Sequence, residues 1–203
     1  MSQIQIGRLL SANTRQFLVG CAVSQFELPS LGALTQVEVS PGYIIYGLIY
    51  DIFIADDGLV RQLVTAPQVD ASVIADHRIN RSVPLEIQVL SLGFQQEGQI
   101  FHLLPPRPPL GLEAMRLCSE KELVAFTSAG RFGYLRHILR EKDEAMGEVL
   151  AAHLQQAGLA HQKVGKPDWA QEAVQEIIIL LRDDYATLIR VLQSLADSLI
   201  FTK

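Results

Sequence analysis

The sequence is poor in the residues that build metal, redox and membrane-spanning sites. Its 203 residues include two cysteines, Cys21 and Cys118, which lie far apart and match no zinc or redox spacing. The longest apolar run, Ile177–Leu181, is far too short to cross a bilayer, and no basic region followed by an apolar run opens the chain. We therefore expect a cytoplasmic protein with reduced, buried thiols and no membrane partner.

Positive charge is also scarce. The first 104 residues hold five arginines, nine acidic residues and no lysine, and the whole chain has a net charge of -5. Neutralising phosphates requires a clustered excess of Lys and Arg, so this composition argues against a chain built to coat nucleic acid. With 49% apolar and 19% charged residues, the chain should fold around a proper core.

Residues 1–104 show the pattern of short β-strands. Polar and apolar residues alternate within Leu34–Val39 and Leu85–Val89, and turn signals such as Pro41-Gly42 separate the runs. Six strands with few helix signals predict a small closed β-barrel, with a short helix over Asp70–Asn80 at one mouth. The expected strands are Ile4–Leu10, Phe17–Val23, Leu34–Ser40, Tyr43–Phe53, Val83–Phe94 and Gln99–Leu104.

A proline-rich stretch, PPRPPLG at residues 105–111, follows the last expected strand. Proline can neither donate to a sheet ladder nor enter a helix interior, so we interpret this stretch as a stiff linker. A ligand motif for a proline-binding domain is the alternative. The interpretation predicts a multi-domain α+β protein: a barrel at 1–104, a linker at 105–111 and a helical domain at 112–203.

The helical domain is predicted to be a bundle that ends in a long amphipathic helix. Ser119 and Glu122 form a capping box, a longer helix runs from about Phe132 to Gly158, and the last helix opens at Asp168. Its apolar residues recur in alternating steps of four and three, which predicts either an antiparallel helix hairpin or a coiled coil between chains. This seam comprises Val174, Ile178, Leu181, Tyr185, Leu188, Leu192, Leu195 and Leu199, of which Leu181 to Leu199 are the candidate interface.

The order of short motifs in the first half resembles a known family. Ile6–Ser11 reads IGRLLS, Leu31-Gly32 precedes Leu34, and Gly47–Ile52 reads GLIYDI. This order resembles the HAS-barrel domain, which unites the N-terminal barrels of HerA-type DNA translocases and of ATP synthase subunits, and the resemblance covers about residues 4–104. It implies a barrel that serves as a docking surface, as family barrels do in the crown of their rings.

The translocases carry a P-loop ATPase after the barrel, and this chain shows none. The nearest approach to a phosphate-binding loop is Ala160–Pro167, which lacks the first glycine and has proline where a hydroxyl residue should bind Mg²⁺. The five histidines have no metal-ligand spacing, and no nucleophile motif appears. We therefore expect no enzyme activity, no metal and no cofactor.

Two groups of residues remain as candidate binding surfaces. Arg131, Arg136, Arg140 and Lys142 form a basic stripe at helical spacing, which could bind phosphate or a partner's carboxylates, or could be a solvated helix face. Tyr43, Tyr46 and Tyr50 alternate on one strand and could form an aromatic contact surface on the barrel wall.

These features predict a non-catalytic assembly or adaptor protein whose partner is another protein or a second copy of the chain. The alternative is a nucleic-acid-associated accessory factor that uses the basic stripe.

Overall fold

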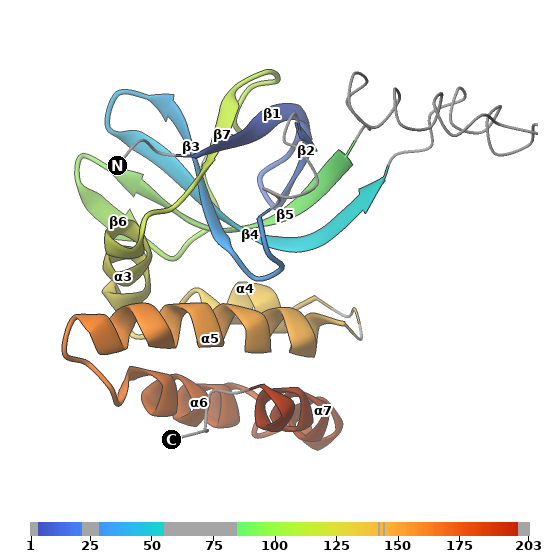
Figure 1. The fold of residues 1–203 in the computed structure, drawn as a ribbon, viewed down its shortest axis with the longest axis vertical. Helices are drawn as coiled ribbons and strands as arrows, with labels where there is room; N and C mark the ends of the chain where they lie inside the picture. Colours follow the sequence, from blue (N-terminus) through green and yellow to red (C-terminus); the bar gives the residue numbers. More distant parts are fainter. Residues whose placement is uncertain (1–3, 22–28, 55–84, 142, 144, 199–203) are drawn as a thin grey trace, which may run out of the picture.

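Six antiparallel strands close into a barrel in the computed structural model, which describes residues 4–21, 29–54, 85–141, 143 and 145–198 (Figure 1). The order around the barrel is β2-β1-β7-β3-β4-β5, and β5 pairs back with β2. The expected α+β class and the closed six-stranded barrel are thus confirmed, while the helix expected at Asp70–Asn80 lies outside the described residues. The strands are β1 (Gln5–Ala12), β2 (Gln16–Cys21), β3 (Leu34–Ser40), β4 (Tyr43–Ile54), β5 (Leu85–Gln96), β6 (Gln99–Phe101) and β7 (Ala114–Leu117).

The sixth barrel strand comes after the prolines. β6 only extends the hairpin with β5, whereas β7 lies between β1 and β3, with Met115 opposite Gly7 and Leu117 opposite Thr35. The proline-rich stretch packs onto the protein, since Pro105 and Pro109 are buried. The boundaries predicted at 104 and 111 therefore do not match the course of the chain, because the barrel extends to Leu117.

The alternation of strand residues separates two cores. On β4, Ile45 and Ile49 point into the barrel with Ile87 and Val89 of β5. Tyr46 and Leu48 belong instead to a second core, which continues through the helices. Both faces of the central strands are thus buried, which is why β4 reads as an almost continuous apolar run.

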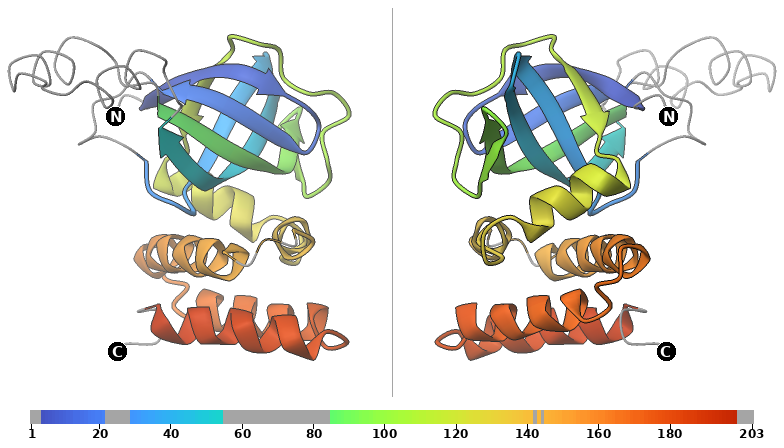
Figure 2. Two further views of the ribbon diagram at one scale, coloured as in Figure 1. Left: turned by 90° about the vertical axis from the view of Figure 1, so that its right-hand side faces the viewer. Right: turned by 90° about the vertical axis from the view of Figure 1, so that its left-hand side faces the viewer.

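Within the part of the chain that the structure describes, five helices lie on one side of the barrel in two layers. Figures 1 and 2 show α5 beneath the barrel with α3 and α4, and α6 and α7 beneath α5. Among the described helices, none has the length and apolar character that crossing a membrane would need. The helices are α3 (Glu120–Ser128), α4 (Leu135–Leu139), α5 (Met146–Lys163), α6 (Trp169–Leu180) and α7 (Tyr185–Asp197).

The predicted helix boundaries are only partly confirmed. The capping box forms at α3, where the Ser119 N–H donates to Glu122 Oε2 at 2.7 Å. The helix expected from Phe132 to Gly158 is interrupted after α4, and α5 continues past Gly158 to Lys163.

The predicted long C-terminal helix is wrong. It breaks at residues 181–184 into α6 and α7, and Asp184 caps α7 by accepting from the Thr187 N–H at 3.1 Å. A continuous coiled-coil seam from Val174 to Leu199 is therefore excluded, because the chain turns in the middle of it.

Gly32 joins the barrel to α5 and provides a test of that contact. Its φ is +75°, and a Cβ there would lie 2.6 Å from the His153 backbone nitrogen. We expect Gly32→Ala to lower the free energy of unfolding by about 1–3 kcal/mol more than Gly42→Ala does. Gly42 is the matched control, because its φ is +78° and a Cβ there would meet no described atom within 4 Å. Equal losses in denaturant unfolding of the two variants would contradict a tight barrel–α5 contact.

Candidate functional site

Four histidines are buried at the junction of the barrel and the helices or between the helices. They are His102, His137, His153 and His161; the fifth, His77, lies outside the described residues. Their sequence separations gave no sign of this clustering, which depends on how α3, α4 and α5 pack. No group of three His, Cys, Asp or Glu side chains within the described ranges could hold a metal ion.

His153 ties α5 to the loop that precedes β3. Its Nδ1 lies 3.0 Å from the Gly32 carbonyl oxygen, and its Nε2 lies 3.3 Å from the Tyr134 hydroxyl. Because a carbonyl can only accept, Nδ1 carries the proton and the Tyr134 hydroxyl donates to Nε2. Full burial lowers the pKa of His153 to about 4 and raises the pKa of Tyr134, so both groups stay neutral at pH 7.

His102 connects the end of β6 to α3 and α4. Its Nε2 donates to the Phe126 carbonyl oxygen at 3.0 Å, and its own carbonyl accepts from His137 Nε2 at 3.2 Å and from the Arg136 guanidinium. Burial is the main cause that lowers the pKa of both imidazoles, and the nearby Arg136 lowers both further. These contacts hold the segment after β6 against the helices.

His161 performs the same role between helices. Its Nε2 donates to the Thr127 hydroxyl of α3 at 2.8 Å, and that hydroxyl donates to the Leu123 carbonyl at 2.7 Å. The imidazole stacks on Trp169 of α6, with ring centroids 4.3 Å apart and an interplanar angle of 5°. Burial and then the Lys166 charge lower its pKa to about 4. All four histidines are therefore neutral structural groups, poorly placed for acid–base work on a dissolved substrate.

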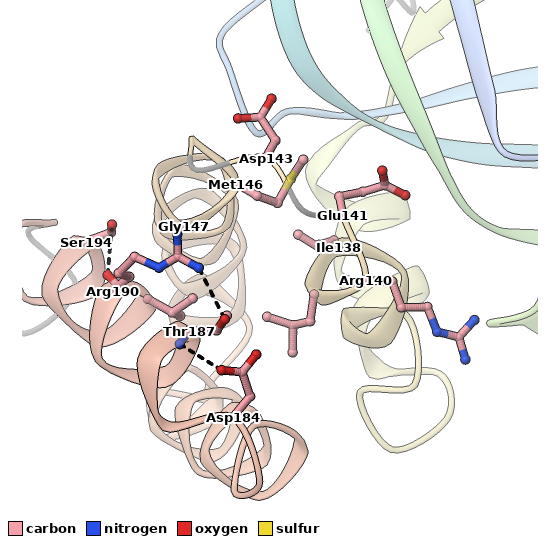
Figure 3. Close-up of a pocket in the computed structure, with 12 residues that line it drawn as sticks. Ile138, Arg140, Glu141, Asp143, Met146, Gly147, Asp184, Thr187, Arg190 and Ser194 are labelled. Carbon is pink, nitrogen blue, oxygen red and sulfur yellow. Dashed lines mark hydrogen bonds between the residues drawn. The ribbon is translucent and has the colours of Figure 1, made fainter.

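A groove of about 380 Å³ separates the α4–α5 turn from α7 (Figure 3). Ile138, Met146 and Val191 give it an apolar floor. The polar groups of α7 are occupied locally, since Arg190 donates to the Thr187 hydroxyl at 3.2 Å and Asp184 caps the helix.

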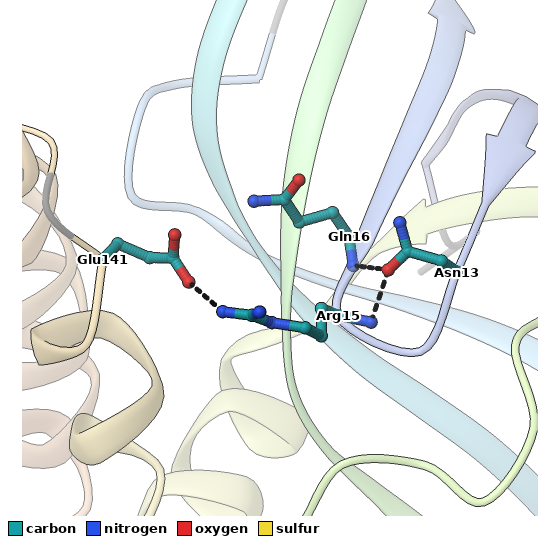
Figure 4. A network of polar contacts seen from close by, with 4 residues as sticks. All are labelled: Asn13, Arg15, Gln16 and Glu141. Carbon is teal, nitrogen blue, oxygen red and sulfur yellow. Dashed lines mark hydrogen bonds and ion pairs between the residues drawn. The ribbon is translucent and has the colours of Figure 1, made fainter.

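An ion pair between Arg15 and Glu141 bridges the barrel and the helices (Figure 4). The Arg15 guanidinium lies 3.4 Å from Glu141 Oε1, just after α4. Asn13 Oδ1 accepts from the backbone N–H groups of Arg15 and Gln16, which fixes the β1–β2 turn that carries the arginine. Because Arg15 is exposed, we assign this pair a minor role in stability.

The predicted basic stripe is not assembled. Arg131 precedes α4 and lies 3.9 Å from Glu176 of α6, whereas Arg136 turns inward to the His102 carbonyl. Arg140 is exposed and points away from the groove in Figure 3, and Lys142 lies outside the described residues. The stripe fails because α4 is only five residues long and gives these side chains no common face.

The predicted aromatic surface on the barrel is also wrong. Tyr46 is buried with its ring centroid 4.6 Å from that of Phe126, and its hydroxyl donates to Gln95 Oε1 at 3.0 Å. Tyr43 is half-buried beside Phe94, and Tyr50 is half-buried against the helical core. The prediction assumed one free face of β4, but the helices cover the face that carries Tyr46 and Tyr50, and Tyr43 packs against the barrel core.

Most of the predicted C-terminal interface is core. Leu181 and Leu195 are buried, Leu188 and Leu192 pack partly against the helical core, and Leu199 lies outside the described residues. Tyr185 is 74% exposed.

The exposed apolar residues of α6 lie just before the predicted interface in the sequence. Ile178, Ile179 and Leu180 at the end of α6 are 42%, 51% and 43% exposed. Together with Tyr185 at the start of α7 they form what we call the α6–α7 patch. Ile178 and Tyr185 belong to the predicted seam, but Ile179 and Leu180 do not. They become exposed because α6 ends at Leu180, and the spacing of apolar residues does not reveal that end.

No model of a known protein family matches the chain, and no curated protein matches it in sequence.

Proposed function

We propose that the protein is a non-catalytic assembly module. The closed barrel is its rigid scaffold, and helices α3–α7 act as a bundle that presents the α6–α7 patch to a protein partner or to a second copy of the chain. The observation that carries the proposal is the exposure of Ile178, Ile179, Leu180 and Tyr185.

The patch spans the end of α6 and the start of α7. Ile178, Ile179 and Leu180 are consecutive and point about 100° apart around the last turn of α6, so the helical core can cover at most one side of them. Tyr185 follows across the short turn at residues 181–184. Exposed apolar residues gathered in one part of a chain mark an interaction site more often than scattered ones do. Covering each half-exposed side chain would stabilise a complex by about 1 kcal/mol.

The resemblance to the HAS-barrel supports the same proposal, since the barrels of that family dock in assemblies. The nucleic-acid alternative is less well supported, because Arg131, Arg136 and Arg140 do not share one surface.

We expect Ile179→Glu to abolish self-association while leaving the fold intact. The substituted carboxylate would have to lose its water in a complex, which is strongly unfavourable, but it remains solvated in the free chain. Light scattering after size exclusion should give a wild-type mass above 22.5 kDa at high concentration and 22.5 kDa for the variant.

Leu159→Glu is the matched control, because Leu159 is a similarly exposed apolar residue on α5, at 55%. It should keep the wild-type mass. Circular dichroism should show the same helix and strand content in all three proteins. An Ile179→Glu variant with the wild-type mass would contradict the role of the α6–α7 patch.

A further inference from the structure

The barrel carries a second exposed apolar surface. Leu10 of β1 and Leu110 and Leu112 of the 105–113 segment are 53%, 68% and 70% exposed. The segment is fixed to β1, because the Leu112 N–H donates to the Leu9 carbonyl at 2.8 Å and the Leu9 N–H donates to the Glu113 carbonyl at 3.0 Å. These three leucines therefore share one edge of the barrel, which we call the barrel ridge.

Leu112 is unfavourably placed for an isolated molecule. Its φ is +68°, in the left-handed region that a leucine rarely adopts, although a glycine is its direct neighbour at 111. The same turn directs an apolar side chain into solvent. Hydrogen bonds from the Leu112 N–H to the Leu9 carbonyl and from Arg8 to the Leu112 carbonyl hold this backbone conformation, but the Leu112 side chain remains 70% exposed.

The ridge and the α6–α7 patch lie at opposite ends of the molecule. In Figures 1 and 2 the yellow-green 105–113 segment runs over the end of the barrel away from the helices, while α6 and α7 form the layer farthest from the barrel. One chain cannot bring its own two surfaces together. Two different surfaces at opposite ends can meet only between copies, in a head-to-tail contact.

The charges at the two ends are complementary. Arg8 and Arg107 are exposed on β1 and on the 105–113 segment, whereas the segment's acidic residue, Glu113, is half-buried. Arg8 is held beside the ridge by donating to the Leu112 carbonyl at 2.9 Å. Residues 166–198, which contain α6 and α7, hold six acidic and three basic side chains. Next to the patch, Asp183 and Asp184 are exposed, and the exposed Arg182 pairs with Asp183 at 3.3 Å, so one acidic charge remains in excess there. Opposite signs at the two ends favour a ridge facing a patch and disfavour two patches facing each other.

We propose that copies of this chain associate head to tail, the barrel ridge of one copy covering the α6–α7 patch of the next. This inference rests on the proposed function, because it uses the same patch, but it adds the partner and the second surface. A two-fold dimer through the patch alone would leave Leu110 and Leu112 uncovered and would bring the acidic groups together.

The test uses one variant of each surface. The ridge variant is Leu110→Asp with Leu112→Asn; asparagine tolerates the left-handed region, so this variant should fold at least as well as the wild type. The patch variant is Ile179→Glu. Head-to-tail association predicts that each variant alone has a mass of 22.5 kDa by light scattering. An equimolar mixture of the two should form a species of twice that mass and nothing larger, because one intact ridge and one intact patch remain.

The outcomes separate this inference from the proposed function. A ridge variant that keeps the wild-type mass while Ile179→Glu is a monomer would overturn head-to-tail assembly and leave the patch as the docking surface. A mixture that stays at 22.5 kDa would also overturn it. If Ile179→Glu keeps the wild-type mass, both proposals fail, and a wild-type protein that remains a monomer at every concentration overturns the head-to-tail inference. Circular dichroism and the Leu159→Glu control exclude misfolding as the cause of any change.

Discussion

Phe126→Ala is expected to lower the free energy of unfolding by about 3–5 kcal/mol. Phe126 is fully buried on α3 and is the meeting point of the barrel and the helices. Its ring centroid lies 4.6 Å from that of Tyr46 on β4, 4.8 Å from that of His102 and 5.6 Å from that of Tyr134. Removing the ring leaves a cavity whose neighbours belong to different elements. These neighbours cannot fill the cavity unless the helices move relative to the sheet.

Trp169 makes this prediction more specific. It is the only tryptophan and lies buried on α6, so its fluorescence reports the helices, while far-UV circular dichroism also reports the barrel. Since one core runs from β4 to α7, both signals should shift to lower denaturant concentration together. Leu123→Ala, at a half-buried site of the same helix, should have a clearly smaller effect. A barrel signal that does not move with the tryptophan signal would show that the barrel and the helices unfold separately.

Acid should destabilise the protein well above the pH at which most carboxylates titrate. The pKa of His153 falls from 6.5 to about 4 on folding because the imidazole is buried. The unfolded chain therefore binds a proton that the folded chain excludes between these two values. Stability is fully present above pH 6.5 and is lost as the pH falls towards 4, by about 3 kcal/mol for this residue. The lowered pKa values of His161, His102 and His137 act in the same direction.

Urea unfolding between pH 7.5 and 4.5 measures this effect while most carboxylates remain ionised. His153→Gln is the informative variant. It should be less stable than the wild type at pH 7.5, because it loses the contacts to Gly32 and Tyr134, but its stability should depend less on pH. A wild-type unfolding free energy that is constant over this range would contradict the buried, neutral state of these histidines.

The barrel could be predicted from the sequence because its longer strands alternate. Every second residue of Leu34–Val39 and of Leu85–Val89 points into the barrel, and this period of two is visible in the sequence. β7 could not be predicted: Ala114–Leu117 is four residues long, too short for a period, and follows prolines. It becomes a strand because β1 and β3 flank it, which is tertiary information.

The helical half was harder to predict. The turn at residues 181–184 keeps nearly the same spacing as a helical turn, so the heptad pattern continues through it although the helix does not. The signal that was missed is Asp184 with Thr187, an N-cap in the middle of the expected helix. The assignment of Tyr46 to a free surface failed for a different reason: the apolar residues on both sides of β4 already indicated a strand buried on both faces.

The position of β7 has a consequence for the synthesis of the chain. The barrel closes by pairing β1 with a strand more than 100 residues later, so the first five barrel strands can be complete while two edges are still open. A nascent chain that ends within the prolines exposes unpaired β1 and β3 backbone, which is a template for pairing with other chains. Closure then requires Leu117 to leave the ribosome, and a fragment cut at residue 104 should aggregate because its β1 and β3 edges have no partner strand. The ribosome thus makes the proline segment immediately before β7, the strand that closes the barrel.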